Sequence, residues 1–277
     1  MRSKYLKYWY MKTVLITGGS SGIGFELALY INGIAKNIVI ISDDDIKLKE
    51  AYSKLIAKEH HSVILNIKCD IGNFAEVNHM SESILSTIGC PDIIINNAGF
   101  AYYHTFDQMT DDEIEKTANV NFIGFLRVTR SFIPYMTKSN SRSCIVNIAS
   151  IAGALPITPN AVYCASKAGM MVFSELLQIE LYPYKIDVIC ICPGKVITPF
   201  FDHESYSNRK LAFETSIVTS INEVVRGVIK AVSLRKKVIF IPKYWFFISW
   251  LIRIDRIISW PLYKLYLSNR VTKLRNY

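Results

Sequence analysis

Short apolar runs alternate with longer helical patterns along most of this 277-residue chain, and this alternation constrains the fold more than any other feature. The apolar runs predict strands, and the segments between them have the spacing of amphipathic helices. Strands are expected at 13–17, 38–41, 63–67, 92–96, 143–149, 186–192 and 237–241. Helices are expected at 25–34, 44–59, 73–88, 111–137, 161–183 and 222–233. Because parallel strands need crossover helices, this order predicts a parallel sheet.

The fold class that follows is α/β, a single Rossmann-type doubly wound domain with a seven-stranded parallel sheet and helices on both faces. Half of the residues are hydrophobic and a fifth are charged, which suits such a sheet and excludes a disordered chain. No repeat or linker divides the chain. We therefore expect one domain over 1–241, followed by a basic, aromatic-rich helical extension over 242–277.

Positive charge is concentrated at the two ends of the chain. Residues 1–12 carry four Lys/Arg and no acid, residues 13–234 carry 18 Lys/Arg and 22 Asp/Glu, and residues 235–277 carry ten Lys/Arg and the single acid Asp255. At the C-terminal end these charges alternate with aromatic and aliphatic residues instead of forming a run. This mixture favours a membrane surface over nucleic acid as a partner.

The remaining bulk features indicate the compartment. The first 12 residues lack the apolar core and cleavage site of a secretory signal. The six cysteines fall largely in or beside expected buried elements, so we interpret them as reduced hydrophobic residues. These features predict a cytoplasmic protein, with the cytosolic face of a membrane as one location. No metal site is expected.

The turn Gly18-x-x-x-Gly22-x-Gly24 follows the first expected strand and opens a helix. Glycines in this position let the backbone approach a pyrophosphate, whose charge is favoured at a helix N-terminus. The turn alone is also compatible with a plain tight connection, or with a methyltransferase that binds a different adenosine cofactor.

Asp43 stands at the end of the second strand, where such folds recognise the adenosine ribose. A carboxylate there accepts hydrogen bonds from both ribose hydroxyls and repels a 2′-phosphate, which favours NAD over NADP without excluding NADP. In the alternative interpretation, Asp43, Asp44 and Asp45 only cap the next helix.

Tyr163 and Lys167 lie four residues apart on one expected helix, and Ser150 ends the strand before it. An ammonium beside a phenol lowers the pKa of the phenol toward the working range of a general acid or base. Taken singly, such a pair is usually surface amphipathicity, and such a serine is usually a cap.

In combination, these motifs resemble the classical short-chain dehydrogenase/reductase family from about Lys12 to Phe200. The resemblance rests on Thr17 to Gly24, Asp70, Asn96 to Gly99, Asn121, Ser150, the Tyr163/Lys167 pair, and Pro193, Gly194 and Thr198. One departure is mild, since Ala149-Ser150 stands where many members carry two serines.

The resemblance implies an NAD(P)-dependent oxidoreductase that moves a hydride between a nicotinamide cofactor and a carbonyl or alcohol. It implies that Ser150 binds the substrate oxygen, Tyr163 exchanges the proton, Lys167 holds the nicotinamide ribose, and Asn121 anchors a proton-relaying water. The expected catalytic residues are Asn121, Ser150, Tyr163 and Lys167. The expected cofactor-binding residues are Thr17, Gly18, Ser20, Ser21, Gly22, Ile23, Gly24, Asp43, Asp70, Ile71, Asn97, Ala98, Gly99, Tyr163, Lys167, Pro193, Gly194, Val196 and Thr198. Dimers and tetramers are common in this family, so a homo-oligomer is expected.

Aromatic residues after the sixth strand favour a hydrophobic, lipid-like substrate. In the family, a substrate-covering segment lies at the position of Phe200, Phe201, His203 and Tyr206. Aromatic residues in such a segment can also serve only to pack it closed. The uncharged run 244–252 is too short to span a bilayer and suits an interfacial helix. The basic and aromatic residues 5–10 are expected to extend that surface. Packing of the extension on the domain remains an alternative.

Reductases of 3-ketosphinganine and other lipid ketones are one candidate branch. Two functions of other classes remain open: a catalytically idle dinucleotide-binding or scaffolding protein, and a methyltransferase. The residues Ser150, Tyr163 and Lys167 weigh against both, because neither function needs that set.

Overall fold

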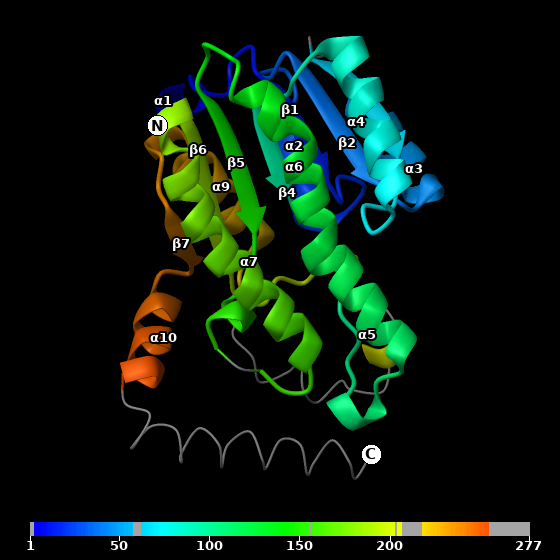
Figure 1. The fold of residues 1–277 in the computed structure, drawn as a ribbon, viewed down its shortest axis with the longest axis vertical. Helices are drawn as coiled ribbons and strands as arrows, with labels where there is room; N and C mark the ends of the chain where they lie inside the picture. The colour runs from blue at the N-terminus through cyan, green and yellow to red at the C-terminus, as the bar shows by residue number, and fades with distance from the viewer. Residues whose placement is uncertain (1–2, 58–61, 156, 203, 207–217, 255–277) are drawn as a thin grey trace.

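The computed structural model describes the chain except residues 1–2, 58–61, 156, 203, 207–217 and 255–277. Its centre is a seven-stranded, entirely parallel sheet in the order β3-β2-β1-β4-β5-β6-β7 (Figure 1). The strands are β1 (Thr13–Thr17), β2 (Asn37–Ser42), β3 (Val63–Lys68), β4 (Ile93–Asn96), β5 (Ser143–Ile148), β6 (Ile186–Pro193) and β7 (Val238–Ile241). The predicted fold class is confirmed, and each expected strand lies within two residues of its predicted bounds.

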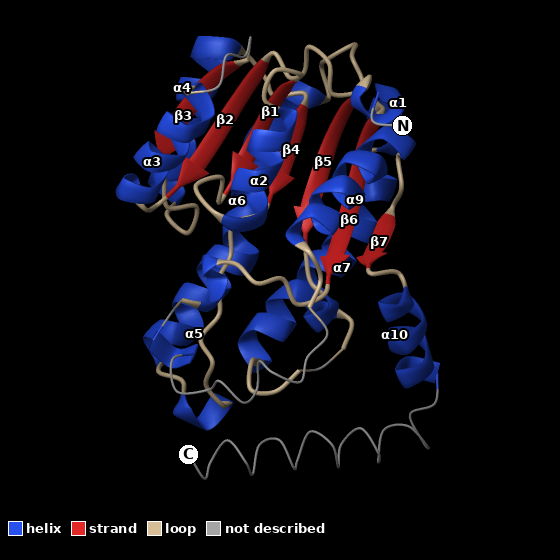
Figure 2. Cartoon of the chain, turned by 180° about the vertical axis from the view of Figure 1, so that it is seen from behind, coloured by secondary structure: helices blue, strands red, loops and turns tan. Residues whose placement is uncertain are grey.

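Helices cover both faces of this sheet (Figures 1 and 2). The helices are α1 (Ser3–Leu6), α2 (Gly22–Ile31), α3 (Asp45–Ile56), α4 (Phe74–Ile88), α5 (Asp111–Ala118), α6 (Phe125–Met136), α7 (Ala161–Glu180), α9 (Ile221–Leu234) and α10 (Tyr244–Ile254). One core joins the sheet to α2, α3 and α9, and a second core joins it to α4, α6 and α7. Along β1, Val14 and Ile16 enter the first core and Leu15 enters the second, because successive strand side chains point to opposite faces.

The long helix expected over 111–137 is interrupted in the structure. A six-residue π-helical segment, Asn119–Gly124, separates α5 from α6. Such segments are rare and often lie at functional sites. At this point Gly124 meets the chain after β3 so closely that a Cβ would lie 2.8 Å from the Ile71 side chain.

The segment before β1 is part of the core. Trp9 is fully buried in the core beneath α9, and its indole Nε1 donates to the Ile229 carbonyl at 3.4 Å. Tyr5, Leu6 and Tyr8 are partly buried against the same core. Figure 1 shows α1 at the end of the sheet opposite to α10. The expectation that residues 5–10 extend the surface of the C-terminal extension is therefore wrong.

Helix α10 begins directly after β7 and extends past the carboxyl ends of the strands (Figure 2). The Phe246 ring packs on Phe240 of β7 at 5.9 Å, whereas Phe247, Trp250 and Leu251 are 63%, 52% and 58% exposed. The predicted extension is thus helical over its described part. The rest, 255–277, lies outside the described residues. Within the described part of the chain, no helix combines the length and apolarity needed to cross a bilayer.

All six cysteines lie within the described residues and are free thiols, as predicted. Cys144, Cys190 and Cys192 are buried in strands, where they serve as small hydrophobic residues.

Candidate active site

The carboxyl ends of the strands carry the predicted site, and the glycine turn after β1 is its most constrained part. Gly18 and Gly22 have φ angles of 63° and 53°, which glycine adopts without strain. A Cβ on Gly24 would lie 2.2 Å from the Gly18 carbonyl oxygen. The turn therefore presents bare backbone at the start of α2, which is the shape a pyrophosphate needs.

Side chains at the end of β1 and directly after β4 hold this turn in place. The Thr17 hydroxyl oxygen accepts hydrogen bonds from the backbone N–H groups of Asn97 and Ala98, at 3.0 and 3.1 Å. In return, the Asn97 amide donates to the carbonyls of Thr17 and Gly18 at 3.0 and 3.1 Å. Four bonds thus join the two predicted motifs into one rigid edge.

Three of the remaining turn residues have structural roles. The Ser20 hydroxyl donates to Ser42 Oγ at 2.9 Å, which ties the turn to the end of β2. Ser21 precedes α2 in extended conformation, and Ile23 packs against the core.

The three consecutive aspartates after β2 make different contacts. Asp44 caps α3 by accepting from the Lys47 N–H at 3.0 Å, and Asp45 pairs with Lys49 at 2.5 Å. Asp43 is exposed and takes part in neither contact. The capping interpretation therefore holds for Asp44, and Asp43 is left as the carboxylate at the end of β2. Asp70 lies after β3, where its carboxylate accepts from the Gly72 N–H at 2.8 Å, and Ile71 beside it is buried.

Ser150, Tyr163 and Lys167 meet at the end of β5. Lys167 is buried, with 3% of its surface exposed, and its ammonium donates to the Ile148 carbonyl at 2.9 Å. The same ammonium lies 5.8 Å from the centroid of the Tyr163 ring. The Ser150 hydroxyl forms a side-chain hydrogen bond with the Tyr163 phenol that lowers the pKa of the phenol. The predicted set is therefore assembled in one place.

Burial shifts the pKa of both titratable groups in the direction that favours the neutral form. Burial raises the pKa of Tyr163 to about 12, against the opposing hydrogen bond from Ser150. Burial also lowers the pKa of Lys167 to about 8, partly offset by the thiols of Cys190 and Cys192. The expectation that Lys167 lowers the pKa of the phenol is not borne out in this structure, because burial raises that pKa and Lys167 is not among the groups that shift it. At neutral pH Tyr163 is a protonated phenol.

Asn121 lies in the π-helical segment and reaches the loop after β4. Its side-chain amide donates to the Phe100 carbonyl at 2.7 Å, and its carbonyl oxygen accepts from the Phe100 N–H at 3.0 Å. A Cβ on Gly99 would lie 2.9 Å from that oxygen and 3.5 Å from the Lys167 ammonium. Asn121, Gly99 and Lys167 are therefore neighbours, and the observed role of the Asn121 side chain is to clamp this loop.

The segment after β6 closes the site from the other side. The Gly194 N–H donates to the Ile241 carbonyl at 2.7 Å, and Val196 is buried in the core. Thr198 lies against the glycine turn, since a Cβ on Gly22 would be 3.3 Å from the Thr198 side chain. Thr198 therefore lies beside the glycine turn, whereas Gly194 lies against the end of β7.

The sequence did not reveal the role of Gly153, nor the contact that Phe200, already expected in the substrate-covering segment, makes with Tyr163. Gly153 allows the turn after β5 to touch α7, because a Cβ there would lie 2.7 Å from the backbone carbonyl of Lys167. Phe200 contacts the Tyr163 ring edge to face, with centroids 5.6 Å apart. A glycine spacing or a lone aromatic residue in one sequence carries no signal for either contact. His203 lies outside the described residues.

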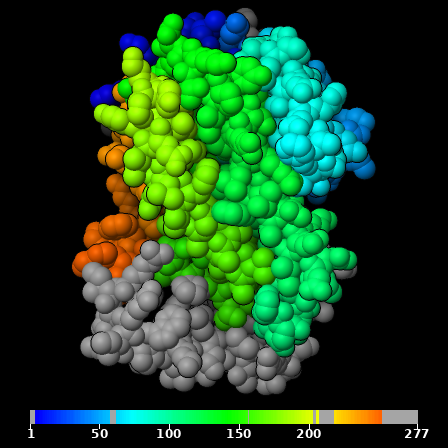
Figure 3. Space-filling view, in the orientation of Figure 1, coloured from blue at the N-terminus to red at the C-terminus, as the bar shows by residue number. Residues whose placement is uncertain are grey.

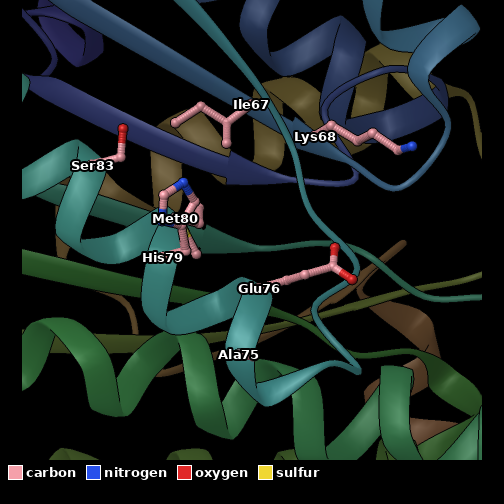
Figure 4. Close-up of a pocket in the computed structure, with 7 residues that line it drawn as sticks. All are labelled: Ile67, Lys68, Ala75, Glu76, His79, Met80 and Ser83. Carbon is pink, nitrogen blue, oxygen red and sulfur yellow. The ribbon is translucent and has the colours of Figure 1, made fainter.

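A separate hollow lies between the edge strand β3 and α4 (Figure 4). Its lining residues are Ile67, Lys68, Ala75, Glu76, His79, Met80 and Ser83. It borders the adenine side of the predicted site only through Glu76, whose carboxylate accepts from the Asp70 N–H at 2.8 Å. None of its residues belongs to the predicted site, and we assign it no role.

Comparison with known proteins identifies the class. The family model for short chain dehydrogenases matches residues 12–208, and the chain belongs to that family. An uncharacterised oxidoreductase of Saccharomyces cerevisiae is 33% identical over 196 residues, covering 68% of this chain and 61% of that protein. The chain therefore spans about three fifths of the length of the yeast relative.

Two further relatives have assigned names. Human estradiol 17-beta-dehydrogenase 11 is 31% identical over 249 residues, covering 87% of this chain and 78% of that protein. The 3-ketodihydrosphingosine reductase of Bacteroides thetaiotaomicron is 32% identical over 194 residues, covering 70% and 67%.

Solved structures share the fold. A short chain dehydrogenase/reductase from Burkholderia phymatum in complex with NAD has a TM-score of 0.81 at 22% identity, over 89% of this chain and 94% of that one. A short-chain dehydrogenase from Sphingobium yanoikuyae in complex with NADPH has a TM-score of 0.75 at 23% identity, over 96% of both chains.

Proposed function

We propose that this protein is an NAD(P)-dependent oxidoreductase that transfers a hydride between a nicotinamide cofactor and a carbonyl or alcohol of a hydrophobic substrate. The observation that carries the proposal is the convergence of Ser150, Tyr163 and Lys167 beside the glycine turn. A scaffolding protein would gain nothing from burying an ammonium next to a phenol at this edge.

The cofactor would lie along the carboxyl edge, with its pyrophosphate over the backbone of Gly18 to Gly24. Asp70 and Ile71 would border the adenine. Lys167 would hold the nicotinamide ribose, and Val196 and Thr198 would fix the carboxamide. The bound cofactor would supply or accept the hydride. Asp43, which α3 does not use, would bind the adenosine ribose and favour NAD over NADP.

The proton chemistry follows from the chain's own residues. Tyr163 would donate its proton to the carbonyl oxygen, and Ser150 would hold that oxygen by a hydrogen bond. A phenol that is protonated at neutral pH suits this reductive direction. Lys167 would replenish the proton through the ribose, and Asn121, by clamping the loop at Phe100, would keep the route to solvent open.

Apolar surroundings support a hydrophobic, lipid-like substrate. Tyr103 and Tyr206 are buried near the site, and Phe200 covers the Tyr163 ring. The names of the human and Bacteroides relatives, a steroid dehydrogenase and a sphingoid-base reductase, agree with this substrate class.

We also propose that the extension 242–277 attaches the protein to the cytosolic face of a membrane. The exposed Phe247, Trp250 and Leu251 of α10 would enter the interface, and the basic residues of the extension would meet anionic lipid. The site and α10 lie at the same end of the molecule (Figure 2).

A homo-oligomer is proposed through the outer faces of α6 and α7, which lie side by side in Figure 3. Val172, Leu176 and Ile179 form an exposed stripe on α7, at 57%, 55% and 74% exposure. Patches of this kind mark protein contacts. Sedimentation velocity gives the oligomeric state directly, and a strictly monomeric protein would refute the proposal.

The substitution Tyr163→Phe tests the reaction. It removes the proton donor and keeps the ring, so turnover should fall by about three orders of magnitude or more while NADH binds with unchanged affinity. Turnover is followed by NADH and NADPH oxidation with long-chain ketones, steroid ketones and short ketones in detergent, and binding is followed by nicotinamide fluorescence. Wild-type rates in the variant would refute the role. Cofactor binding without turnover of any carbonyl by the wild type would favour the idle dinucleotide-binding alternative.

A further inference from the structure

The segment after β6 touches the proposed proton donor directly. The ring centroids of Phe200 and Tyr163 lie 5.6 Å apart, with 60° between the ring planes. This is the edge-to-face arrangement that aromatic pairs prefer, and it stabilises the pair beyond the area it buries. Phe200 therefore restricts the orientation of the Tyr163 ring.

Phe200 is itself held by a chain of further rings. Its centroid is 5.0 Å from that of Phe201, Phe201 is 5.3 Å from Tyr206, and Tyr206 is 5.0 Å from Tyr103. We call Tyr103, Phe200, Phe201 and Tyr206 the aromatic wall. Tyr103 and Tyr206 are only 4% and 6% exposed, so the wall is anchored in the protein interior.

A hydrogen bond fixes the wall across two segments far apart in the sequence. The Tyr103 N–H, in the loop between β4 and η1 (Phe106–Gln108), donates to Ser205 Oγ at 3.1 Å. Ser205 lies in the short 3-10 helix η6 (Glu204–Tyr206), and Phe200 lies in η5 (Pro199–Phe201). The described part of the segment after β6 is thus joined to the far side of the site.

The Tyr163 ring consequently has neighbours of opposite character. The Lys167 ammonium lies 5.8 Å from its centroid, and the Phe200 phenyl ring lies 5.6 Å from it. When the oxygen of a substrate carbonyl is hydrogen-bonded to the Tyr163 phenol, the substituents of that carbonyl lie near the Lys167 ammonium and the Phe200 ring. An alkyl or aryl substituent is stabilised by burial against the wall, whereas a hydroxylated one loses hydrogen bonds to water there.

We propose that Phe200 is a positioning and specificity-determining residue, which orients the Tyr163 ring and forms, with the aromatic wall, the apolar surface against which a substituent of the substrate carbonyl packs. The site would therefore select carbonyls with an alkyl or aryl flank over hydroxylated ones. This inference rests on the proposed function, and it adds the residue that selects between apolar and hydroxylated substrates.

The test compares Phe200→Ala and Phe200→Leu with the wild type on two ketones of equal length, one alkyl and one hydroxylated. For the alkyl ketone, Phe200→Ala should raise KM at least tenfold, and Phe200→Leu, which keeps an apolar side chain, should restore most of the loss. For the hydroxylated ketone, KM should change less than threefold. Phe106→Ala is the matched control, because its ring is 64% exposed on η1 and belongs to neither the wall nor the site.

A pH profile separates positioning from simple loss of packing. Water that enters in place of the phenyl ring should reduce the desolvation of Tyr163. The upper alkaline limb of kcat/KM, set by the Tyr163 phenol, should therefore move to lower pH in Phe200→Ala and not in Phe106→Ala, whereas the lower one, set by Lys167 with its pKa of about 8, should stay in place. Equal KM changes for the two ketones, together with an unmoved upper alkaline limb, would overturn the inference.

A binding measurement keeps this inference distinct from the proposed reaction. The alkyl ketone is titrated into the NADH complexes of Tyr163→Phe and of Tyr163→Phe/Phe200→Ala, neither of which relies on turnover. We expect at least tenfold weaker binding by the double variant. If no carbonyl is turned over by the wild type, the proposed reaction is refuted, but this titration still shows whether the aromatic wall binds the substituent of the ketone. Equal affinities would refute the proposed role of Phe200 and the aromatic wall, and would leave the proposed reaction unaffected.

Discussion

Lys167 shows how a single residue combines a functional position with a cost in stability. Its ammonium is buried at the end of β5, and only the Ile148 carbonyl is seen to accept from it among the described residues. Removing a charge from water is unfavourable unless it is well paired, which is why the pKa of Lys167 falls to about 8. The fold thus holds a group that would be more stable outside it, as is common at sites kept for chemistry.

This cost predicts a pH dependence of stability. Between about pH 8 and the ordinary lysine value of 10.5, the unfolded chain binds the Lys167 proton and the folded chain does not. The contribution of Lys167 to the free energy of unfolding should therefore rise with pH, by at most about 1.4 kcal/mol per pH unit. Urea unfolding of wild type and Lys167→Met at pH 7, 8 and 9 isolates this contribution as the difference between the two proteins. Cys69, Cys90 and Cys144 do not interact with Lys167 and cancel, whereas the coupling of Lys167 to Cys190 and Cys192 is part of the measured difference. A difference that does not change with pH would show that the ammonium is not desolvated.

The candidate site residues that the structure brings together each carry a local signal in the sequence. The glycine turn, the tyrosine and lysine four residues apart, and the serine at a strand end can all be read from spacing. The altered pKa of Tyr163 and the contact with Phe200 could not be read, because both depend on side chains brought together from β5, α7 and the segment after β6.

At the scale of elements, the period and length of the apolar pattern were sufficient to predict the strands but not the structure of the region 111–137. An apolar pattern of helical spacing continues through Asn119–Gly124, so the sequence predicts one helix. The change to π-helical hydrogen bonding accompanies the close approach of Gly124 to Ile71 and the bonds from Asn121 to Phe100. Both contacts come from other parts of the chain, and no local propensity reports them.

The segment before β1 makes a second prediction at this scale. Trp9 is fully buried and Tyr10 beside it is 66% exposed. Replacing Trp9 by alanine should cost about 3–5 kcal/mol in the free energy of unfolding, because it leaves a large cavity and removes the indole hydrogen bond to the Ile229 carbonyl. Tyr10→Ala, the matched control, should change it by less than about 0.5 kcal/mol. Chemical denaturation measures both, and equal effects would show that the segment is not part of the core.

At the scale of the whole molecule, the mouth of the site and α10 share one end, whereas α1 lies at the other (Figure 1). The proposed membrane contact should therefore depend on the extension 242–277, through the exposed side chains of α10, and not on the segment before β1. Phe247→Asp/Trp250→Asp should reduce cosedimentation with vesicles of anionic phospholipid by at least tenfold and leave the oxidation of NADH by a short, water-soluble ketone unchanged.

The matched control for this experiment is Tyr10→Asp, an exposed aromatic residue at the opposite end. It should sediment with vesicles as the wild type does. Removal of 242–277 should abolish sedimentation. Continued sedimentation of the truncated protein would mean that another surface holds the lipid, or that α10 serves as a packing element.

The burial of Trp9 also determines where the chain can be truncated without exposing its core. The family match begins at residue 12 and ends at 208, yet the core beneath the sheet takes in Trp9 from one side of that stretch and Val224, Val228 and Ile241 from the other. A fragment cut at the limits of similarity would leave its interior open to water on two sides. Expression trials of such a fragment should yield insoluble material, even though every residue of the proposed chemistry would be present in it.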